Sequence, residues 1–198
     1  DEPVIGVGHS FGAVVTYMAA CEAPELFKGI VLCDPPVMTG FGGRIIALLK
    51  RLGWGDYITP AKRTLQRKQW WDLDEDRSAY FARKPLFKEF HPQCIDDYVK
   101  SVSVMKTGMK TLSYDVNVEV GIFRHMPTNI HQYYQRCQVP SLLLTGSAPN
   151  VTMPLFVKPF LKGNPSMEHS LVEGGHLFVL ETPTKTAQSM RHFIAELL

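Results

Sequence analysis

Residues 4–13 of the chain read Val-Ile-Gly-Val-Gly-His-Ser-Phe-Gly-Ala, and this stretch decides the fold. The apolar run at residues 4–7 is bounded by a proline and a glycine, and an apolar run this short is typical of a buried strand. Apolar residues then recur at helical spacing over residues 11–19, and Pro24 ends that pattern. We therefore predict a strand that leads directly into a helix, with Ser10 at the turn between them.

The turn contains the pattern Gly-x-Ser-x-Gly, formed by Gly8, Ser10 and Gly12. A serine at a tight strand-to-helix turn takes a strained backbone, and the residues two before and two after it crowd each other unless they lack side chains. The helix that begins there also points its N-terminal amides at any anion formed near the serine. The pattern predicts a nucleophilic Ser10; the alternative is a glycine-rich turn that exposes an ordinary serine.

Strand and helix patterns occur at both ends of the chain. A second apolar run at residues 29–33 ends at Asp34, and a strand, a helix and a strand in succession build a parallel sheet. The last part of the chain predicts two more strands, at residues 142–144 and 169–172, and two more helices, at residues 155–161 and 182–197. We predict an α/β protein whose core comprises residues 1–37 and 137–198.

Residues 38–136 differ in character from the two ends. Short helical patterns and aromatic residues dominate this stretch, and it carries 16 Lys and Arg against 10 Asp and Glu. The rest of the chain has an excess of acidic residues. This change in charge and periodicity predicts an inserted, mostly helical subdomain.

The composition excludes several classes of protein. A chain of 198 residues, 45% of them hydrophobic, suits one domain with a sizeable insertion. A net charge of +2 argues against a nucleic-acid partner, and no run approaches the roughly 18 apolar residues of a membrane span. The four cysteines lie far apart, which favours buried thiols in a cytoplasmic protein over disulfides or a zinc site. We expect neither a metal nor a cofactor.

A nucleophilic serine needs a base, because its hydroxyl is a poor nucleophile at neutral pH. Of the seven histidines, His176 alone follows a predicted strand and a pair of glycines near the C-terminus. A loop at the carboxyl end of a strand can reach over a parallel sheet to a nucleophile on a neighbouring strand. We therefore predict that His176 is the base; the alternative is an ordinary surface histidine.

Together, the turn at Ser10, the insertion at residues 38–136 and the Gly-Gly-His-Leu-Phe segment around His176 resemble the α/β-hydrolase superfamily over the whole chain. The resemblance implies the α/β-hydrolase fold, a parallel sheet flanked by helices, with a helical cap inserted. It also implies that Ser10 attacks a carbonyl carbon, that His176 removes the serine proton, and that the backbone amide of Phe11 binds the oxyanion. An aspartate nucleophile would suggest a dehalogenase or an epoxide hydrolase, and Ser10 disfavours both.

The resemblance leaves the acid of the triad open. The family usually places it just after the strand at residues 142–145, where residues 146–151 contain no carboxylate. The family's other position follows the preceding core strand, where Asp34 stands, and a buried carboxylate there would orient His176. The alternative for Asp34 is turn formation before a proline, and Asn150 is the fallback orienting residue.

The resemblance also implies a substrate pocket near the nucleophile. We assign substrate contacts to His9, beside the nucleophile, and to Trp70 and Trp71 of the cap; packing in the core of the insertion is the alternative for the tryptophans. We expect a small-molecule acyl substrate of apolar character.

Family members carry further strands before the nucleophile strand, which here begins within five residues of Asp1. We therefore expect a missing N-terminal segment of the same protein to pair with the chain, because a central strand would otherwise leave a bare edge.

The resemblance predicts a serine hydrolase that cleaves an ester, a thioester or a related acyl bond through an acyl-serine intermediate. One alternative is a carbon–carbon bond hydrolase of the same fold, suggested by the glycine-rich stretch at residues 38–43. Another alternative is a catalytically silent binding module, because the usual position of the acid holds no carboxylate. Labelling of Ser10 by a fluorophosphonate separates an enzyme from a silent module.

Overall fold

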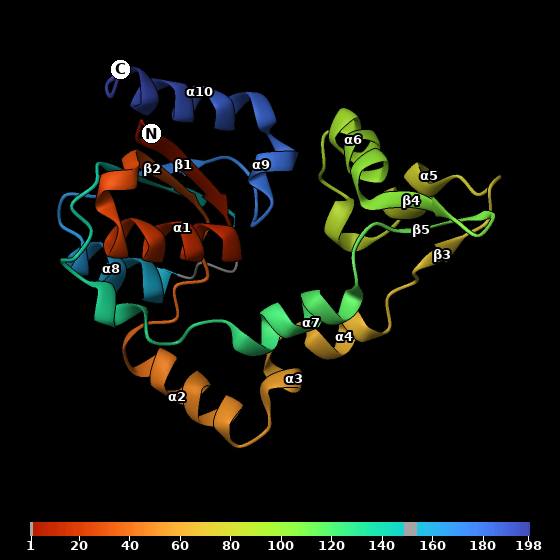
Figure 1. Ribbon diagram of the computed structural model, residues 1–198, viewed down its shortest axis with the longest axis horizontal. Coiled ribbons are helices and arrows are strands. Elements are labelled where there is room, and N and C mark those ends of the chain that lie inside the picture. Colours follow the sequence, from red (N-terminus) through yellow and green to blue (C-terminus); the bar gives the residue numbers. More distant parts are fainter. Residues whose placement is uncertain (1, 149–153) are drawn as a thin grey trace. The chain divides into compact units, whose positions relative to one another are not determined.

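The computed structural model describes residues 2–148 and 154–198, and the chain divides into two compact units (Figure 1). The first unit contains the residues up to Leu48 and those from Pro127 onward. The second unit is the intervening stretch, Leu49–Met126. It lies inside the insertion predicted at residues 38–136. Residues 38–48 and 127–136 of that insertion belong to the first unit.

The first unit is built on a parallel sheet of four strands. In spatial order these are β1 (Val4–His9), β2 (Phe27–Cys33), β6 (Ser141–Gly146) and β7 (Glu168–Val172). All three neighbouring pairs run parallel, so the chain must return from the carboxyl end of one strand to the amino end of the next through a crossover connection. The α/β class with a parallel sheet is therefore confirmed.

Side chains of β2 alternate between the two faces of the sheet, as successive residues of any strand do. Ile30 and Leu32 join a buried apolar cluster on one face, whereas Val31 and Cys33 join a second cluster on the other. Because both faces are buried, residues 29–33 of the strand form a continuous apolar run with no polar alternation, which is typical of a parallel sheet.

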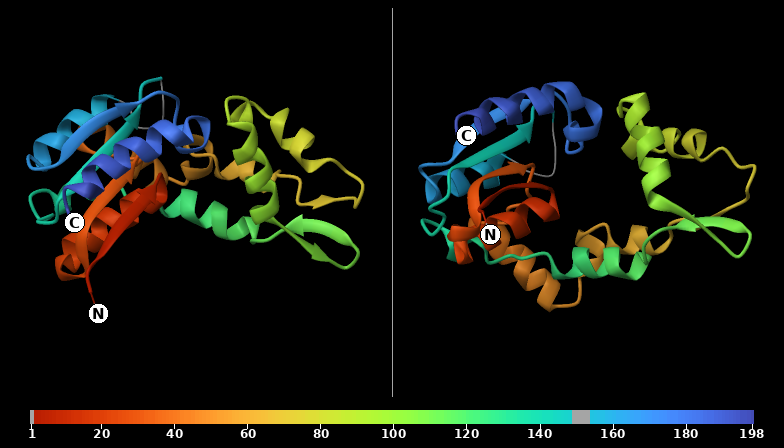
Figure 2. Two further views of the ribbon diagram at one scale, coloured as in Figure 1. Left: turned by 90° about the horizontal axis from the view of Figure 1, so that it is seen from above. Right: turned by 45° about the horizontal axis from the view of Figure 1, so that its top comes forward.

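Helices cover both faces of the sheet. The first cluster packs helices α1 (Phe11–Glu22) and α8 (Pro154–Gly163) against the sheet, and the second packs α10 (Pro183–Ala195) on the opposite face. Figures 1 and 2 show this order of layers, with α10 on one side of the strands and α1 and α8 on the other. The first unit is thus a three-layer arrangement of helices, sheet and helices.

The first unit contains four further helical segments among its described residues. They are η1 (Pro24–Leu26), α2 (Gly40–Arg51, which runs into the second unit), η3 (Ile130–Tyr133) and α9 (Phe178–Glu181). Across the residues that the structure describes, no helix has both the length and the apolar character needed to cross a membrane.

Strand β1 lies at the edge of the four described strands, and this differs from the buried strand that its sequence predicts. It pairs with β2 on one side, and within the described residues no strand pairs with its other side. Val4 and Val7 are accordingly 58% and 52% exposed. The apolar character of β1 is that of a central strand, but its position in this sheet is that of an edge strand.

The second unit, predicted from the sequence to be mostly helical, also contains three strands. It contains an antiparallel sheet in the order β3, β5, β4. Helix α6 ends at Val102, and strand β4 begins at the next residue, Ser103. The elements of the unit are α3 (Gly55–Ile58), α4 (Ala61–Leu65), β3 (Trp70–Trp71), α5 (Arg77–Ala82), η2 (Pro85–Phe87), α6 (Pro92–Val102), β4 (Ser103–Lys106), β5 (Met109–Leu112) and α7 (Val116–His125).

The turn from β1 to α1 is tightly packed on one side of Ser10 and open on the other. A Cβ atom on Gly8 would lie 2.5 Å from the carbonyl oxygen of Gly12 and 2.6 Å from the Cα atom of Ala13. A Cβ atom on Gly12, in contrast, would have no described atom within 4 Å apart from its chain neighbours and the backbone of its own helix. The crowding predicted for both glycines therefore holds for Gly8 alone, because Gly8 faces the helix backbone.

This asymmetry predicts opposite effects on stability. Gly8→Ala should lower the free energy of unfolding by about 1–3 kcal/mol, because backbone atoms must move to admit the methyl group. Gly12→Ala is the matched control, and it should raise the free energy of unfolding by up to about 1 kcal/mol, because alanine is the better helix former. Urea unfolding of the whole protein measures both, and equal destabilisation by the two changes would contradict the packing described here.

Candidate active site

Strand pairing places two of the predicted residues side by side. His9 pairs with Cys33 in the register of β1 and β2, so Ser10 and Asp34 follow directly at the carboxyl ends of adjacent strands. The N–H of Ser10 donates to the carbonyl of Cys33 at 2.8 Å, which extends the pairing by one residue. The N–H of Asp34 donates to the carbonyl of Leu144 in β6 at 2.8 Å. The peptide group that joins Cys33 to Asp34 is therefore hydrogen-bonded on both sides.

Both residues have backbone angles that L-amino acids rarely adopt. The φ angle is +54° at Ser10 and +44° at Asp34. Strain of this kind persists only where the surrounding structure enforces it, and it is concentrated at functional sites. At Ser10 the sharp turn ends the strand and starts helix α1 at the next residue, Phe11. The nucleophile of the proposed triad therefore stands at the N-terminus of a helix.

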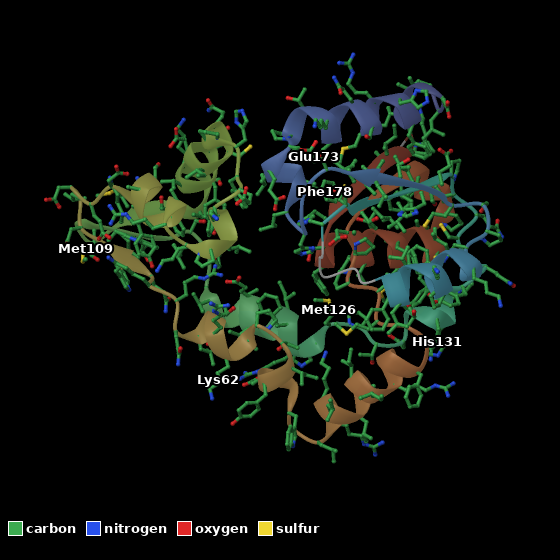
Figure 3. The ribbon with its side chains drawn as sticks, turned by 180° about the vertical axis from the view of Figure 1, so that it is seen from behind. Lys62, Met109, Met126, His131, Glu173 and Phe178 are labelled. Carbon is green, nitrogen blue, oxygen red and sulfur yellow. The ribbon has the colours of Figure 1, made fainter. Side chains whose placement is uncertain are left out.

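His176 comes from the loop between β7 and α9, a loop bracketed by Glu173 and Phe178 (both labelled in Figure 3). Gly174 has a φ of +128°, and a Cβ atom there would lie 2.6 Å from the carboxylate of Glu181. The N–H of Gly175 donates to that carboxylate at 2.6 Å. The two glycines thus let the loop turn closely around Glu181 before it presents His176.

The imidazole of His176 bridges Ser10 and Asp34. Its Nε2 atom lies 3.0 Å from the hydroxyl oxygen of Ser10, and its Nδ1 atom lies 2.6 Å from Oδ2 of Asp34. Because a carboxylate only accepts, Nδ1–H donates to Asp34, which leaves Nε2 to accept the hydroxyl proton of Ser10. The structure brings the three residues together as predicted, in the arrangement of a nucleophile, a base and an orienting acid.

The environment of Asp34 suits that arrangement. Its side chain is fully buried, whereas the His176 side chain is 21% exposed and so remains reachable from outside. The neighbouring Cys33 is also buried, and burial together with the charge of Asp34 raises the pKa of its thiol to about 12. Cys33 therefore stays protonated at neutral pH and does not compete with Ser10 as a nucleophile.

His9 points toward the same loop. Its Nε2 atom lies 2.8 Å from the backbone carbonyl of His176, and the two imidazole rings have centroids 4.9 Å apart. Burial lowers the pKa of His9 below the ordinary histidine value. The residue predicted to contact substrate thus has one ring nitrogen engaged with the protein itself.

Phe11, whose backbone amide is predicted to bind the oxyanion, lies at the start of helix α1. Phe11 is the first residue of α1, and the first N–H groups of a helix have no partner within the helix. These N–H groups lie at the positive end of the helix dipole, next to Ser10, which directly precedes Phe11 in the chain.

The two tryptophans predicted to contact the substrate, Trp70 and Trp71, belong to the second unit. Trp71 is 1% exposed and packs against Tyr80 and Phe81, so it forms part of that unit's aromatic core. Trp70, its neighbour in β3, is 42% exposed. Core packing, the alternative considered for these residues, describes Trp71.

Two residues mark the limits of the sequence analysis. Asn150, the fallback orienting residue, lies outside the residues that the structure describes. Glu181, which anchors the His176 loop, was not singled out, because an acidic residue in a short helix carries no distinctive pattern. The pair Gly174–Gly175 could have indicated such an anchor, because a loop with two adjacent glycines needs a contact that fixes its backbone.

In the described part of the chain, no group of three His, Cys, Asp or Glu residues could hold a metal ion.

Curated relatives match part of the chain. A type I acyl-CoA thioesterase, mpaH of Penicillium roqueforti (strain FM164), is 32% identical over 103 residues, which cover 50% of this chain and 21% of that protein. Lipase LipV of Mycobacterium tuberculosis (strain ATCC 25618 / H37Rv) is 35% identical over 77 residues, which cover 37% of this chain and 29% of the lipase. The chain therefore matches less than a third of the length of these relatives.

Solved structures share the fold over nearly the whole chain. The structure of E-2-(acetamidomethylene)succinate hydrolase superposes with a TM-score of 0.78 at 18% identity, covering 98% of this chain and 67% of that one. A model of the family described as "Alpha/beta hydrolase family" matches residues 1–189. Since this match includes the strands, the turn at Ser10 and the His176 loop, the chain belongs to the alpha/beta hydrolase family.

Proposed function

We propose that the protein is a serine hydrolase that cleaves an ester or thioester through an acyl-serine intermediate. The observation that carries the proposal is the hydrogen-bonded series in which His176 joins Ser10 to the buried Asp34. Membership of the hydrolase family supports it, as do the thioesterase and the lipase among the relatives.

In the first half of the reaction, the hydroxyl oxygen of Ser10 attacks the carbonyl carbon of the substrate while Nε2 of His176 takes the hydroxyl proton. The tetrahedral intermediate carries a negative charge on the former carbonyl oxygen, and the amide of Phe11 donates to it. The intermediate collapses, the bond to the leaving group breaks, and His176 returns the proton to the departing alcohol or thiol. The acyl group is then bound to Ser10.

In the second half, water replaces the alcohol or thiol. His176 takes a proton from the water as it attacks the acyl carbon, and the resulting intermediate collapses to release the carboxylic acid and restore the Ser10 hydroxyl. Asp34 holds His176 in the tautomer that leaves Nε2 free to accept, and it stabilises the imidazolium formed in each half.

The proposed substrate class rests on the names of the similar proteins. The similar proteins include an acyl-CoA thioesterase and a lipase, both of which act on acyl groups. We therefore infer an apolar acyl substrate. The alternative of a silent binding module is disfavoured, because a protein without catalysis has no need for a strained serine aligned with a base and a buried acid.

Replacing the nucleophile should abolish both turnover and covalent labelling. In the whole protein, Ser10→Ala should lower hydrolysis of a short p-nitrophenyl ester by several orders of magnitude, because the acyl-serine cannot form. It should also prevent labelling by a fluorophosphonate. Ser189→Ala is the matched control, since the hydroxyl of this half-buried serine on α10 donates within its own helix, to the carbonyl of Lys185. If Ser10→Ala is labelled as fast as the control, Ser10 is not the nucleophile.

Replacing the acid tests the choice between Asp34 and Asn150. Asp34→Asn should lower kcat by about 10³- to 10⁴-fold, because an amide favours the wrong tautomer of His176 and cannot stabilise its positive charge. Asp97→Asn, at an exposed carboxylate of the second unit, is the control and should leave kcat within a factor of two. If Asn150→Ala lowers kcat more than Asp34→Asn does, the orienting role belongs to Asn150.

A further inference from the structure

The hydrogen bond from His9 to His176 joins two segments that lie 167 residues apart in sequence. His9 is the last residue of β1, directly before Ser10, and its acceptor is the backbone carbonyl of His176. The bond therefore ties the backbone of the predicted base to the strand that carries the predicted nucleophile. It does so without using either nitrogen of the His176 ring, which remain engaged with Asp34 and Ser10.

The chemistry of this bond fixes which ring nitrogen of His9 carries a hydrogen. A carbonyl oxygen only accepts, so Nε2 of His9 must carry a hydrogen. Burial lowers the pKa of His9 below the ordinary histidine value, although the hydrogen bond to the backbone of His176 opposes this shift; the nearby His176 side chain lowers the pKa further, and Asp34 raises it. His9 is therefore neutral at neutral pH and donates without adding a second positive charge beside His176, whose imidazolium forms during the reaction.

The His176 loop needs such a bond, because its glycines leave its backbone free to move. On the side before His176, the carbonyl of Gly174 accepts from the N–H of Ala148 at 2.9 Å, and Glu181 holds the N–H of Gly175. These contacts tie the loop to the end of β6 and to α9. The bond from His9 adds a tie to β1, so the backbone of His176 is held at a set distance from Ser10.

We propose that His9 is a positioning residue, whose neutral imidazole holds the backbone of His176 so that its ring reaches Ser10 and Asp34 together. The inference rests on the proposed serine-hydrolase function and assigns His9 a role other than substrate contact. Loss of the bond leaves the carbonyl of His176 without its donor and lets the ring move away from Ser10. A displacement of about 1 Å at such a site can lower the rate by 10²-fold.

Three variants of the whole protein separate the hydrogen bond from the bulk of the side chain. His9→Gln places an amide N–H at the same number of bonds from Cβ as the imidazole Nε2, so it should keep the bond. His9→Phe keeps a ring of similar size but has no donor. His9→Asn has the donor of the glutamine, but its shorter side chain does not reach. The glutamine and asparagine variants therefore form a matched pair that differs by one methylene group.

The measurements are kcat and KM for a short p-nitrophenyl ester, and the low-field proton resonance of the Nδ1–H of His176 in its bond to Asp34. We expect His9→Phe and His9→Asn to lower kcat by roughly 10- to 100-fold with KM within a factor of about two, and to weaken or broaden the resonance. His9→Gln should restore kcat to within a factor of about three and restore the resonance. Thermal unfolding of each variant identifies any that fails to fold, and the asparagine variant then replaces the phenylalanine one.

Two results would overturn the proposal. If His9→Phe or His9→Asn folds and keeps both kcat and the resonance of the parent protein, the bond does not position His176. If the variants raise KM and leave kcat unchanged, His9 contacts the substrate instead. A parent protein that neither hydrolyses the ester nor reacts with a fluorophosphonate refutes the proposed serine-hydrolase function. The resonance does not require turnover, so it still tests whether His9 positions His176.

Discussion

The pairing of β1 with β2 is the interaction on which the candidate site depends. Because His9 lies opposite Cys33 in a parallel register, the next residue of each strand emerges at the same edge of the sheet. That next residue is Ser10 in one strand and Asp34 in the other. A shift of the register by one residue would exchange the faces of every side chain in β1 and separate the serine from the carboxylate. The rest of the site, including the loop of His176, is arranged around these two fixed positions.

The site combines local strain with strong local support. Ser10 and Asp34 hold positive φ angles, which cost energy for residues with side chains. Backbone hydrogen bonds from each of them to the next strand, the close approach of Gly8 to the start of α1, and the anchoring of the His176 loop by Glu181 oppose relaxation of that strain. Ser10 and Asp34 are therefore held at strand ends, which are more rigid than a free loop, whereas His176 lies on a loop that its hydrogen bonds anchor.

Much of the first unit could be predicted from the sequence, because its strands are apolar runs bounded by clear turn residues and its Gly-x-Ser-x-Gly pattern lies between a strand and a helix. The positions of Ser10, Asp34 and His176 follow from the same logic, since parallel strands bring their carboxyl ends to one edge. The antiparallel sheet of the second unit could not be predicted, because strands of two to four residues carry no measurable period. Nor could the partner of His9, a backbone carbonyl 167 residues away, because carbonyl groups are the same in every sequence.

A crystal structure of the whole protein after reaction with a fluorophosphonate tests the central claim most directly. The account predicts a covalent bond between phosphorus and the hydroxyl oxygen of Ser10, with a phosphonyl oxygen accepting a hydrogen bond from the amide of Phe11. It also predicts that His176 remains between Ser10 and Asp34. Phosphorus attached to another residue, or a phosphonyl oxygen directed away from the N-terminus of α1, would contradict it.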